Sequence, residues 1–181
     1  MSTKTYAALL RGINVGGKHI VPMKDLAEIF ATAECKDVRT YIQSGNVVFT
    51  CTNNVAAGLC RSLEKKIEAR YGFPAPVVLR SHEELAQVSR SNPFLKAGKA
   101  EQTLYVSFLA NEPAAEAVAK LDPQRSPGDE FRVIGREIYL HFPNGAGRSK
   151  LTNAYFDSRL STTSTSRNWA TVLKLLEMTH G

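Results

Sequence analysis

The stretch Val38-Arg-Thr-Tyr-Ile-Gln-Ser-Gly-Asn-Val-Val-Phe-Thr50 decides the fold that we expect. Its two ends, Val38–Ile42 and Val47–Thr50, are rich in β-branched and aromatic residues, which favour strands. Ser44-Gly45 between them favours a tight turn. The stretch therefore predicts a β-hairpin.

A helix and a strand are expected on either side of this hairpin. Upstream, the apolar run Tyr6–Leu10 predicts a buried strand, and apolar residues at helical spacing predict a helix over Pro22–Ala33. Downstream, the same spacing predicts a helix over Ala56–Tyr71 that ends at Gly72, followed by a strand over Pro76–Leu79. The order β-α-β-β-α-β is that of a ferredoxin-like fold.

The second half of the chain repeats most of this order. A short helix over 82–88 and a stretch with Asn92-Pro93 and Gly98 lead to a domain boundary, so we expect one domain at 1–93 and another at 94–181. The elements expected in the second domain are strands over 103–109, 129–134 and 137–142, and helices over 113–121, 150–160 and 167–178. No fourth strand is evident, and Ser161–Ser166 is interpreted as helix capping plus a flexible linker. We therefore predict an α+β protein of two ferredoxin-like (alpha-beta plait) halves, with antiparallel sheets and helices on one face.

The composition is that of an ordinary globular protein. The chain has 181 residues, 43% of them hydrophobic and 22% charged, and no apolar stretch long enough for a membrane span or a signal peptide. Its three cysteines form no CxxC pair, so we expect reduced thiols, no metal site and a cytoplasmic location. The net charge of +6 suits an anionic ligand without requiring nucleic acid.

The loop Arg11-Gly-Ile-Asn-Val-Gly-Gly-Lys18 matches the opening of a Walker A motif, which cradles phosphates. However, His19 stands where Ser or Thr would bind magnesium, and Ile20-Val21-Pro22 delay the helix that should stabilise the phosphates. A nucleoside triphosphatase is therefore disfavoured. Two interpretations stay open: a looser anion nest, with Arg11 and Lys18 as its charges, and a plain loop that needs glycine at positive φ.

Two further polar segments are candidates for ligand binding. Gln43, Ser44 and Asn46 either face a ligand or serve their own turn. Arg148, Lys150 and Arg167 also lie near the starts of the last two expected helices, whose N-termini attract anions. The candidate ligand-binding residues are Arg11, Asn14, Gly16, Gly17, Lys18, Ser44, Asn46, Arg148, Lys150, Arg167 and Asn168. The patterns identify no catalytic residue and no cofactor.

Three functions are compatible with these features. The first is a protein or enzyme that binds an anionic small molecule, such as a phosphate ester, at the basic loops. The second, less expected, is an RNA-binding module in which Tyr105 and Tyr139 stack bases on an open sheet. The third is an interaction protein without catalysis that uses a sheet edge or the last helix. The sequence does not decide whether the protein is an enzyme.

Six motifs are spread over nearly the whole chain. They are Arg11-Gly-Ile-Asn-Val-Gly-Gly, Met23-Lys-Asp-Leu, Thr40-Tyr-Ile-Gln-Ser-Gly-Asn-Val-Val-Phe, Asn92-Pro-Phe, Ser149-Lys-Leu-Thr and Arg167-Asn-Trp-Ala-Thr-Val. Together they resemble an uncharacterised bacterial family, the one labelled domain of unknown function 1697. The resemblance implies a bacterial cytosolic protein of two alpha-beta plaits. It implies no activity, cofactor or catalytic residue.

Overall fold

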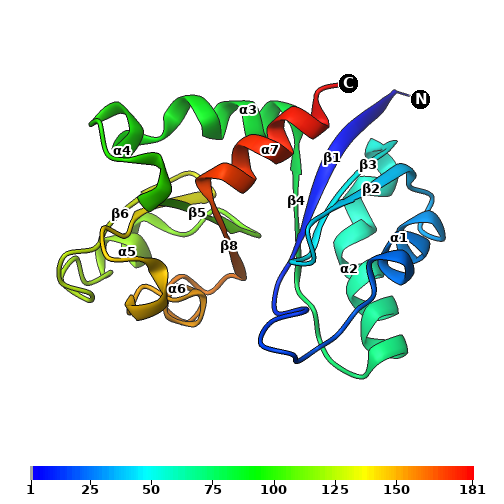
Figure 1. The fold of residues 1–181 in the computed structure, drawn as a ribbon, viewed down its shortest axis with the longest axis horizontal. Coiled ribbons are helices and arrows are strands. Elements are labelled where there is room, and N and C mark those ends of the chain that lie inside the picture. The colour runs from blue at the N-terminus through cyan, green and yellow to red at the C-terminus, as the bar shows by residue number, and fades with distance from the viewer. Residues whose placement is uncertain (1) are drawn as a thin grey trace. The chain divides into compact units, whose positions relative to one another are not determined.

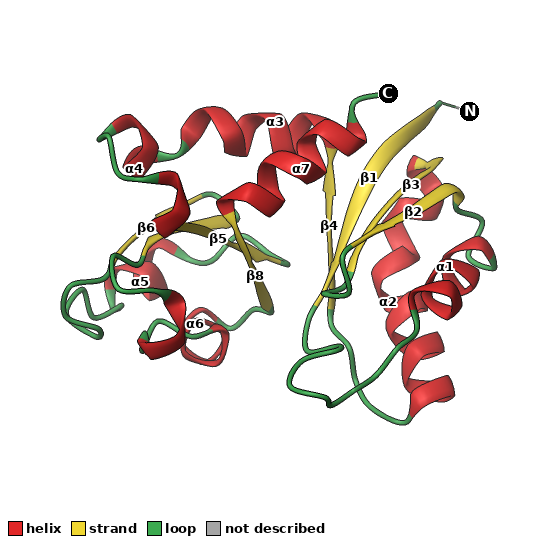
Figure 2. Ribbon diagram, in the orientation of Figure 1, coloured by secondary structure: helices red, strands yellow, loops and turns green. Residues whose placement is uncertain are grey.

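The computed structural model describes residues 2–181 and consists of two compact units (Figures 1 and 2). Residues up to Ala86, together with Leu175–Gly181, form the first unit, and Gln87–Lys174 form the second. The boundary after Ala86 lies within a helix, and the C-terminal residues belong to the first unit. The sequence places the boundary between residues 93 and 94.

The first unit contains a four-stranded antiparallel sheet in the order β2-β3-β1-β4. Its elements are β1 (Thr3–Leu10), α1 (Met23–Ala31), β2 (Lys36–Tyr41), β3 (Asn46–Thr52), α2 (Asn53–Tyr71) and β4 (Val77–Ser81). This order of strands, with two helices between them, is ferredoxin-like, as predicted. Helix α3 (His82–Ser91) follows, and its capping box joins Ser81 N–H to Glu84 Oε2 (2.8 Å) and Glu84 N–H to Ser81 Oγ (3.2 Å).

Helices α1 and α2 cover the same face of this sheet. Leu26 and Phe30 of α1 and Leu63 of α2 belong to one buried cluster with sheet residues such as Leu10 and Phe49. The rings of Phe30 and Phe49 lie 5.2 Å apart. The helical spacing of the apolar residues thus predicted correctly which side chains form this core.

The second unit has a sheet of the same topology, in the order β6-β7-β5-β8. Its elements are α4 (Pro93–Lys96), η1 (Glu101–Thr103), β5 (Leu104–Leu109), α5 (Ala115–Ala119), β6 (Glu130–Ile134), β7 (Glu137–His141), η2 (Ala146–Arg148), α6 (Asn153–Leu160), β8 (Ser164–Asn168) and α7 (Trp169–Thr179), whose last residues belong to the first unit. Side chains of α5 and α6 pack on one face of the sheet. The second half is therefore also ferredoxin-like.

Strand β8 corrects the interpretation of the Ser/Thr run as a linker, and α7 begins at Trp169 instead of Arg167. Ser164 is fully buried, and its hydroxyl is satisfied because Oγ donates to Asp157 Oδ1 at 2.7 Å. Ser166 Oγ likewise donates to Asn153 Oδ1 at 2.8 Å. Because α6 supplies acceptors for these hydroxyls, a polar segment can be buried as an edge strand without an apolar pattern in its sequence.

Candidate functional site

The candidate residues of the first unit gather at one end of its sheet. They lie in the loop after β1 and in the turn between β2 and β3. Leu10, the last residue of β1, donates its N–H to Gly45 O in that turn at 2.8 Å, which holds the two segments together. Gly45 fits this junction closely, because a Cβ built on it would lie 2.9 Å from Leu10 Cβ. The sequence therefore predicted two separate segments that the fold brings together.

The loop after β1 is a small hairpin. Lys18 N–H donates to Val15 O at 3.0 Å, and Gly16 and Gly17 between them have φ of 57° and 72°. Positive φ at both central residues is typical of a type I′ turn. Helix α1 begins only at Met23, so its first amides do not adjoin the glycines as they would in a Walker A loop. The glycines are thus explained by the turn itself.

Two of the candidate amides hold these turns in place. Asn14 Nδ2 donates to Val21 O at 3.0 Å, and Asn14 Oδ1 accepts from Val21 N–H at 2.9 Å. Asn46 is fully buried, and its Nδ2 donates to Tyr41 O at 3.2 Å and to Ser44 Oγ at 3.0 Å. These side chains therefore position the loop and the turn, while Lys18 remains exposed at the tip.

In the second unit, Arg148 and Lys150 are exposed and precede α6 by several residues. The expected helix start at Lys150 is three residues early, because Thr152 caps α6 by accepting from Tyr155 N–H at 3.2 Å. Lys150 N–H instead donates to Ser126 Oγ at 3.1 Å. Arg148 is the last residue of the 3₁₀ turn η2 and Lys150 lies in the loop after it, so neither belongs to the N-terminus of α6.

Arg167 and Asn168, expected together at a helix start, have different surroundings. Arg167 lies in β8, and its Nη1 donates to Thr165 Oγ1 at 2.7 Å. Burial lowers the pKa of the Arg167 guanidinium to about 10, which leaves it charged at neutral pH. Asn168 ends the strand and caps α7 by accepting from Thr171 N–H at 2.8 Å. Consecutive strand residues point to opposite faces, so the structure separates these two candidates.

Asn168 instead lines a cavity of about 400 Å³ at the start of α7, which we call the α7 cavity. The lining residues are Glu101, Gln102, Tyr105, Asn168, Trp169 and Ala170. Its volume lies in the range of small-molecule sites. Two aromatic residues, two residues with amide side chains, one acidic residue and the first turn of a helix thus line a single space.

Trp169 has an unusual feature for a cavity wall. The side chain is only 1% exposed, and its indole N–H has no hydrogen-bond acceptor within residues 2–181. Buried donors in folded proteins nearly always have an acceptor. The sequence indicated that Trp169 belongs to the core, which is correct. It gave no sign of the cavity, because Tyr105 and Trp169 are 64 positions apart and come together only through the pairing of β5 with β8.

The two tyrosines of the RNA hypothesis lie on opposite faces of the sheet. Tyr105 is paired with Leu140, and Tyr139 with Val106, so the rings alternate in direction. Tyr139 is 2% exposed and its hydroxyl donates to Val88 O at 3.5 Å. Tyr105 packs on the helix-covered core. The two rings therefore do not form one exposed surface for stacking bases.

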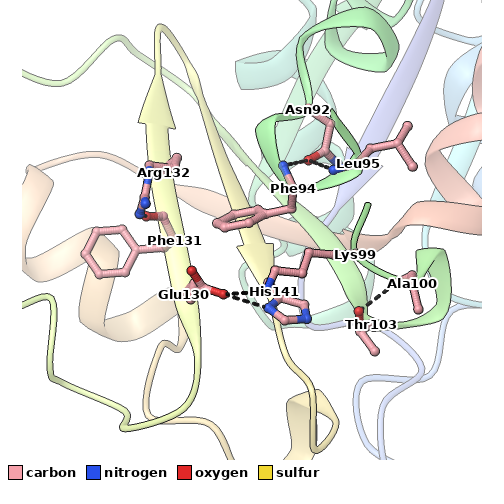
Figure 3. Close-up of polar contacts among 10 residues, drawn as sticks. All are labelled: Asn92, Phe94, Leu95, Lys99, Ala100, Thr103, Glu130, Phe131, Arg132 and His141. Atoms are coloured by element: carbon pink, nitrogen blue, oxygen red, sulfur yellow. Dashed lines mark hydrogen bonds and ion pairs between the residues drawn. The ribbon is translucent and has the colours of Figure 1, made fainter. Parts of the chain in front are cut away.

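A polar cluster that the sequence did not reveal lies on β6 and β7 (Figure 3). Glu130 Oε1 is 3.0 Å from His141 Nδ1 and 3.5 Å from Lys99 Nζ. The hydrogen bond from His141 lowers the pKa of Glu130 below its usual range. The guanidinium of Arg132 lies 5.7 Å from the ring centroid of Phe94. The cluster joins the segment around α4 to the sheet.

The cysteines are free, and Cys35 and Cys51 are buried. Burial raises the pKa of Cys35 to about 12 and that of Cys60 to about 11, so both are weak nucleophiles at neutral pH. Within residues 2–181, no three His, Cys, Asp or Glu side chains are grouped to hold a metal ion. None of the described helices is long and apolar enough to cross a membrane.

Comparison with known proteins identifies relatives of the chain but no activity. Residues 3–139 match the family described as "Protein of unknown function (DUF1697)". Among solved structures, the conserved bacterial protein SP0830 from Streptococcus pneumoniae is similar, with 24% sequence identity and a TM-score of 0.75, covering 99% of this chain and 100% of that chain. This likeness supports the fold. A search of curated proteins found no match.

Proposed function

We propose that this chain, which belongs to the DUF1697 family of proteins of unknown function, binds a small anionic molecule in the α7 cavity. The observation that carries the proposal is that Trp169, a residue of the cavity lining, has a buried indole N–H with no acceptor within residues 2–181. A buried donor without an acceptor costs about 1–3 kcal/mol. A ligand oxygen at this donor would recover that cost.

The start of α7 favours a negatively charged group. The first amides of a helix have no intrahelical acceptor, and the helix dipole adds a partial positive charge there. Among these amides, Asn168 Oδ1 accepts a hydrogen bond only from the N–H of Thr171. Because Tyr105 and Asn168 are a non-bonded pair of the β5–β8 ladder, the N–H of Trp169 is directed at β5, so the amide of Ala170, which lines the cavity, would be the one to meet an anion.

The other walls narrow the class of ligand. Tyr105 and Trp169 offer aromatic surface for a flat or apolar portion. The carboxylate of Glu101 repels a second negative charge. We therefore favour a singly charged carboxylate or phosphate diester on a flat body over a doubly charged phosphate monoester. Because the indole nitrogen is shielded from solvent, binding includes a small movement of the cavity wall.

A thermal-shift screen tests the proposal. The panel contains benzoate, inorganic phosphate, a cyclic nucleotide, a nucleoside monophosphate and a short RNA. A ligand at 100 times its Kd stabilises a fold by about 2.7 kcal/mol, which raises Tm by roughly 5–10 °C for a chain of this size.

Trp169→Phe keeps an aromatic ring but removes the donor, and should weaken binding about tenfold or more, the cost of losing a hydrogen bond to a charged group. Lys18→Ala, in the loop of the first unit, is the matched control and should leave binding unchanged. A ligand whose affinity falls with Lys18→Ala but not with Trp169→Phe would refute the α7 cavity as the site. A shift with RNA alone would favour the RNA-binding alternative.

We also propose that this binding takes place in the cytoplasm. The support is that all three cysteines are free thiols, which are kept reduced in that compartment. Fractionation of cells that carry the native chain should recover it with cytoplasmic marker proteins, and recovery with an oxidising compartment would contradict the assignment.

A further inference from the structure

We propose that β6 is a dimer interface, pairing antiparallel with β6 of a second copy of the chain. The inference is independent of the proposed function. Strand β6 ends the sheet of the second unit and is paired only with β7 among the strands of residues 2–181. Its other edge therefore presents backbone N–H and C=O groups that a further strand can bond.

The edge strand β2 of the first unit shows how such an edge is protected. Its register with β3 shifts between Lys36 and Arg39, and Asp37 adopts a φ of 51°. Bulges and lysines of this kind prevent pairing with another chain. In contrast, β6 keeps one register from Glu130 to Ile134 and leaves Ile134 46% exposed; it has no proline or lysine, and its two charged residues, Glu130 and Arg132, are of opposite sign.

The hairpin geometry determines which backbone groups of β6 point outward. Gly135 and Arg136 are the two turn residues, so Ile134 and Glu137 form a hydrogen-bonded pair. Bonded and non-bonded pairs alternate along an antiparallel ladder. The backbone groups of Phe131 and Val133 therefore face away from β7. Phe131 O accepts from Arg132 Nη1 at 2.9 Å, so this carbonyl does not serve β7, and the Arg132 side chain must turn away from it when a partner strand pairs.

These groups allow three registers, and charge favours one of them. If Phe131 bonds to the partner's Phe131, Glu130 lies opposite the partner's Arg132, and this pair occurs twice about the two-fold axis. If Phe131 bonds to the partner's Val133, Arg132 lies opposite the partner's Arg132, which is unfavourable. If Val133 bonds to the partner's Val133, Arg132 lies opposite the partner's Ile134, which offers no opposite charge. Within the chain, Lys99 and His141 both contact Oε1 of Glu130, so a contact with the partner's Arg132 would use the other oxygen, Oε2. The charge pattern thus selects a second copy in the first register.

A groove beside the strand, lined by both apolar and charged residues, adds surface to the interface. It has a volume of about 600 Å³ and runs between β6 and the segment from α5 to Gln124, with Val118, Leu121, Phe131 and Val133 among its lining residues. The two-fold axis of an antiparallel strand pair is perpendicular to the sheet, so the grooves of both copies adjoin on one face. Because the strand has only five residues, the contact is small and the dimer should depend on concentration.

Sedimentation velocity over a concentration series tests the proposal. The native chain should pass from a mass near 19.9 kDa to twice that value as concentration rises. Val133→Pro removes an outward N–H without touching the bonds to β7, and should leave a folded monomer. Arg132→Glu places like charges opposite each other and should weaken the dimer tenfold or more, and adding Glu130→Arg should restore it.

Lys36→Glu on β2 makes the same kind of charge change at the protected edge and should leave the dimer unchanged. Circular dichroism verifies that each variant is folded. A native chain that is monomeric at every concentration would overturn the proposal. A dimer that neither Val133→Pro nor Arg132→Glu weakens would overturn it equally.

Discussion

Gly45 allows a quantitative prediction about the junction between the β2–β3 turn and the loop after β1. Its φ is +77°, and a Cβ at this position would lie 2.9 Å from Leu10 Cβ, 3.0 Å from Leu10 O and 3.2 Å from Ile13 Cδ1. In Gly45→Ala the left-handed backbone costs about 1–2 kcal/mol. Overpacking against a strand backbone adds about 1–3 kcal/mol. We expect a total loss of about 2–5 kcal/mol, a fall in Tm of roughly 5–15 °C.

Gly72→Ala separates these two contributions. Gly72 has an almost identical φ of +76°, but a Cβ there would meet no atom within 4 Å. It should therefore lose only the backbone cost of about 1–2 kcal/mol. Urea unfolding followed by circular dichroism measures both variants. Equal losses in the two variants would show that the close approach of Gly45 to Leu10 has no energetic weight.

Three further predictions concern the first unit. Gly58→Ala should stabilise the fold by about 0.5–1 kcal/mol in urea unfolding, because Gly58 lies within α2 and a Cβ there would meet no atom; a loss would show that the helix is strained at this point. Thr52→Ala should cost about 1 kcal/mol, since Thr52 Oγ1 caps α2 by accepting from Val55 N–H at 3.3 Å; an unchanged midpoint would exclude that cap. Burial raises the pKa of Cys35 from 9.0 to about 12 and that of Cys60 to about 11. Unfolding therefore releases protons at alkaline pH, and the free energy of unfolding should fall as pH rises from about 9 to about 12. A titration that gives the thiols of the native protein an ordinary Cys pKa would contradict this.

Most of the fold could be predicted because its signals are local. The helical spacing in α1 and α2 and the turn at Ser44-Gly45 are contained in short segments, and so they predicted the elements and the core. Strand β8 could not be predicted in this way. Its burial depends on acceptors from Asn153 and Asp157 of α6, which a pattern within the segment itself cannot show.

The candidate site residues remain a prediction, and the structure shows that several of them have structural roles. Asn14 and Asn46 hold turns, and Arg167 is buried on the face opposite to Asn168. Asn168 lines the α7 cavity, but the tyrosine and the tryptophan beside it come together only through strand pairing. Polarity and glycine content in a sequence therefore mark turns as readily as they mark ligand sites.

The indole N–H of Trp169 gives the most direct test of ligand binding in the α7 cavity. The chain has a single tryptophan, so a ¹H–¹⁵N correlation spectrum contains one indole resonance. Titration with a ligand found in the thermal screen should move that resonance in a saturable manner, together with the backbone amides of Asn168, Trp169 and Ala170. An indole resonance that stays in place while the amides of the loop after β1 move would contradict the account.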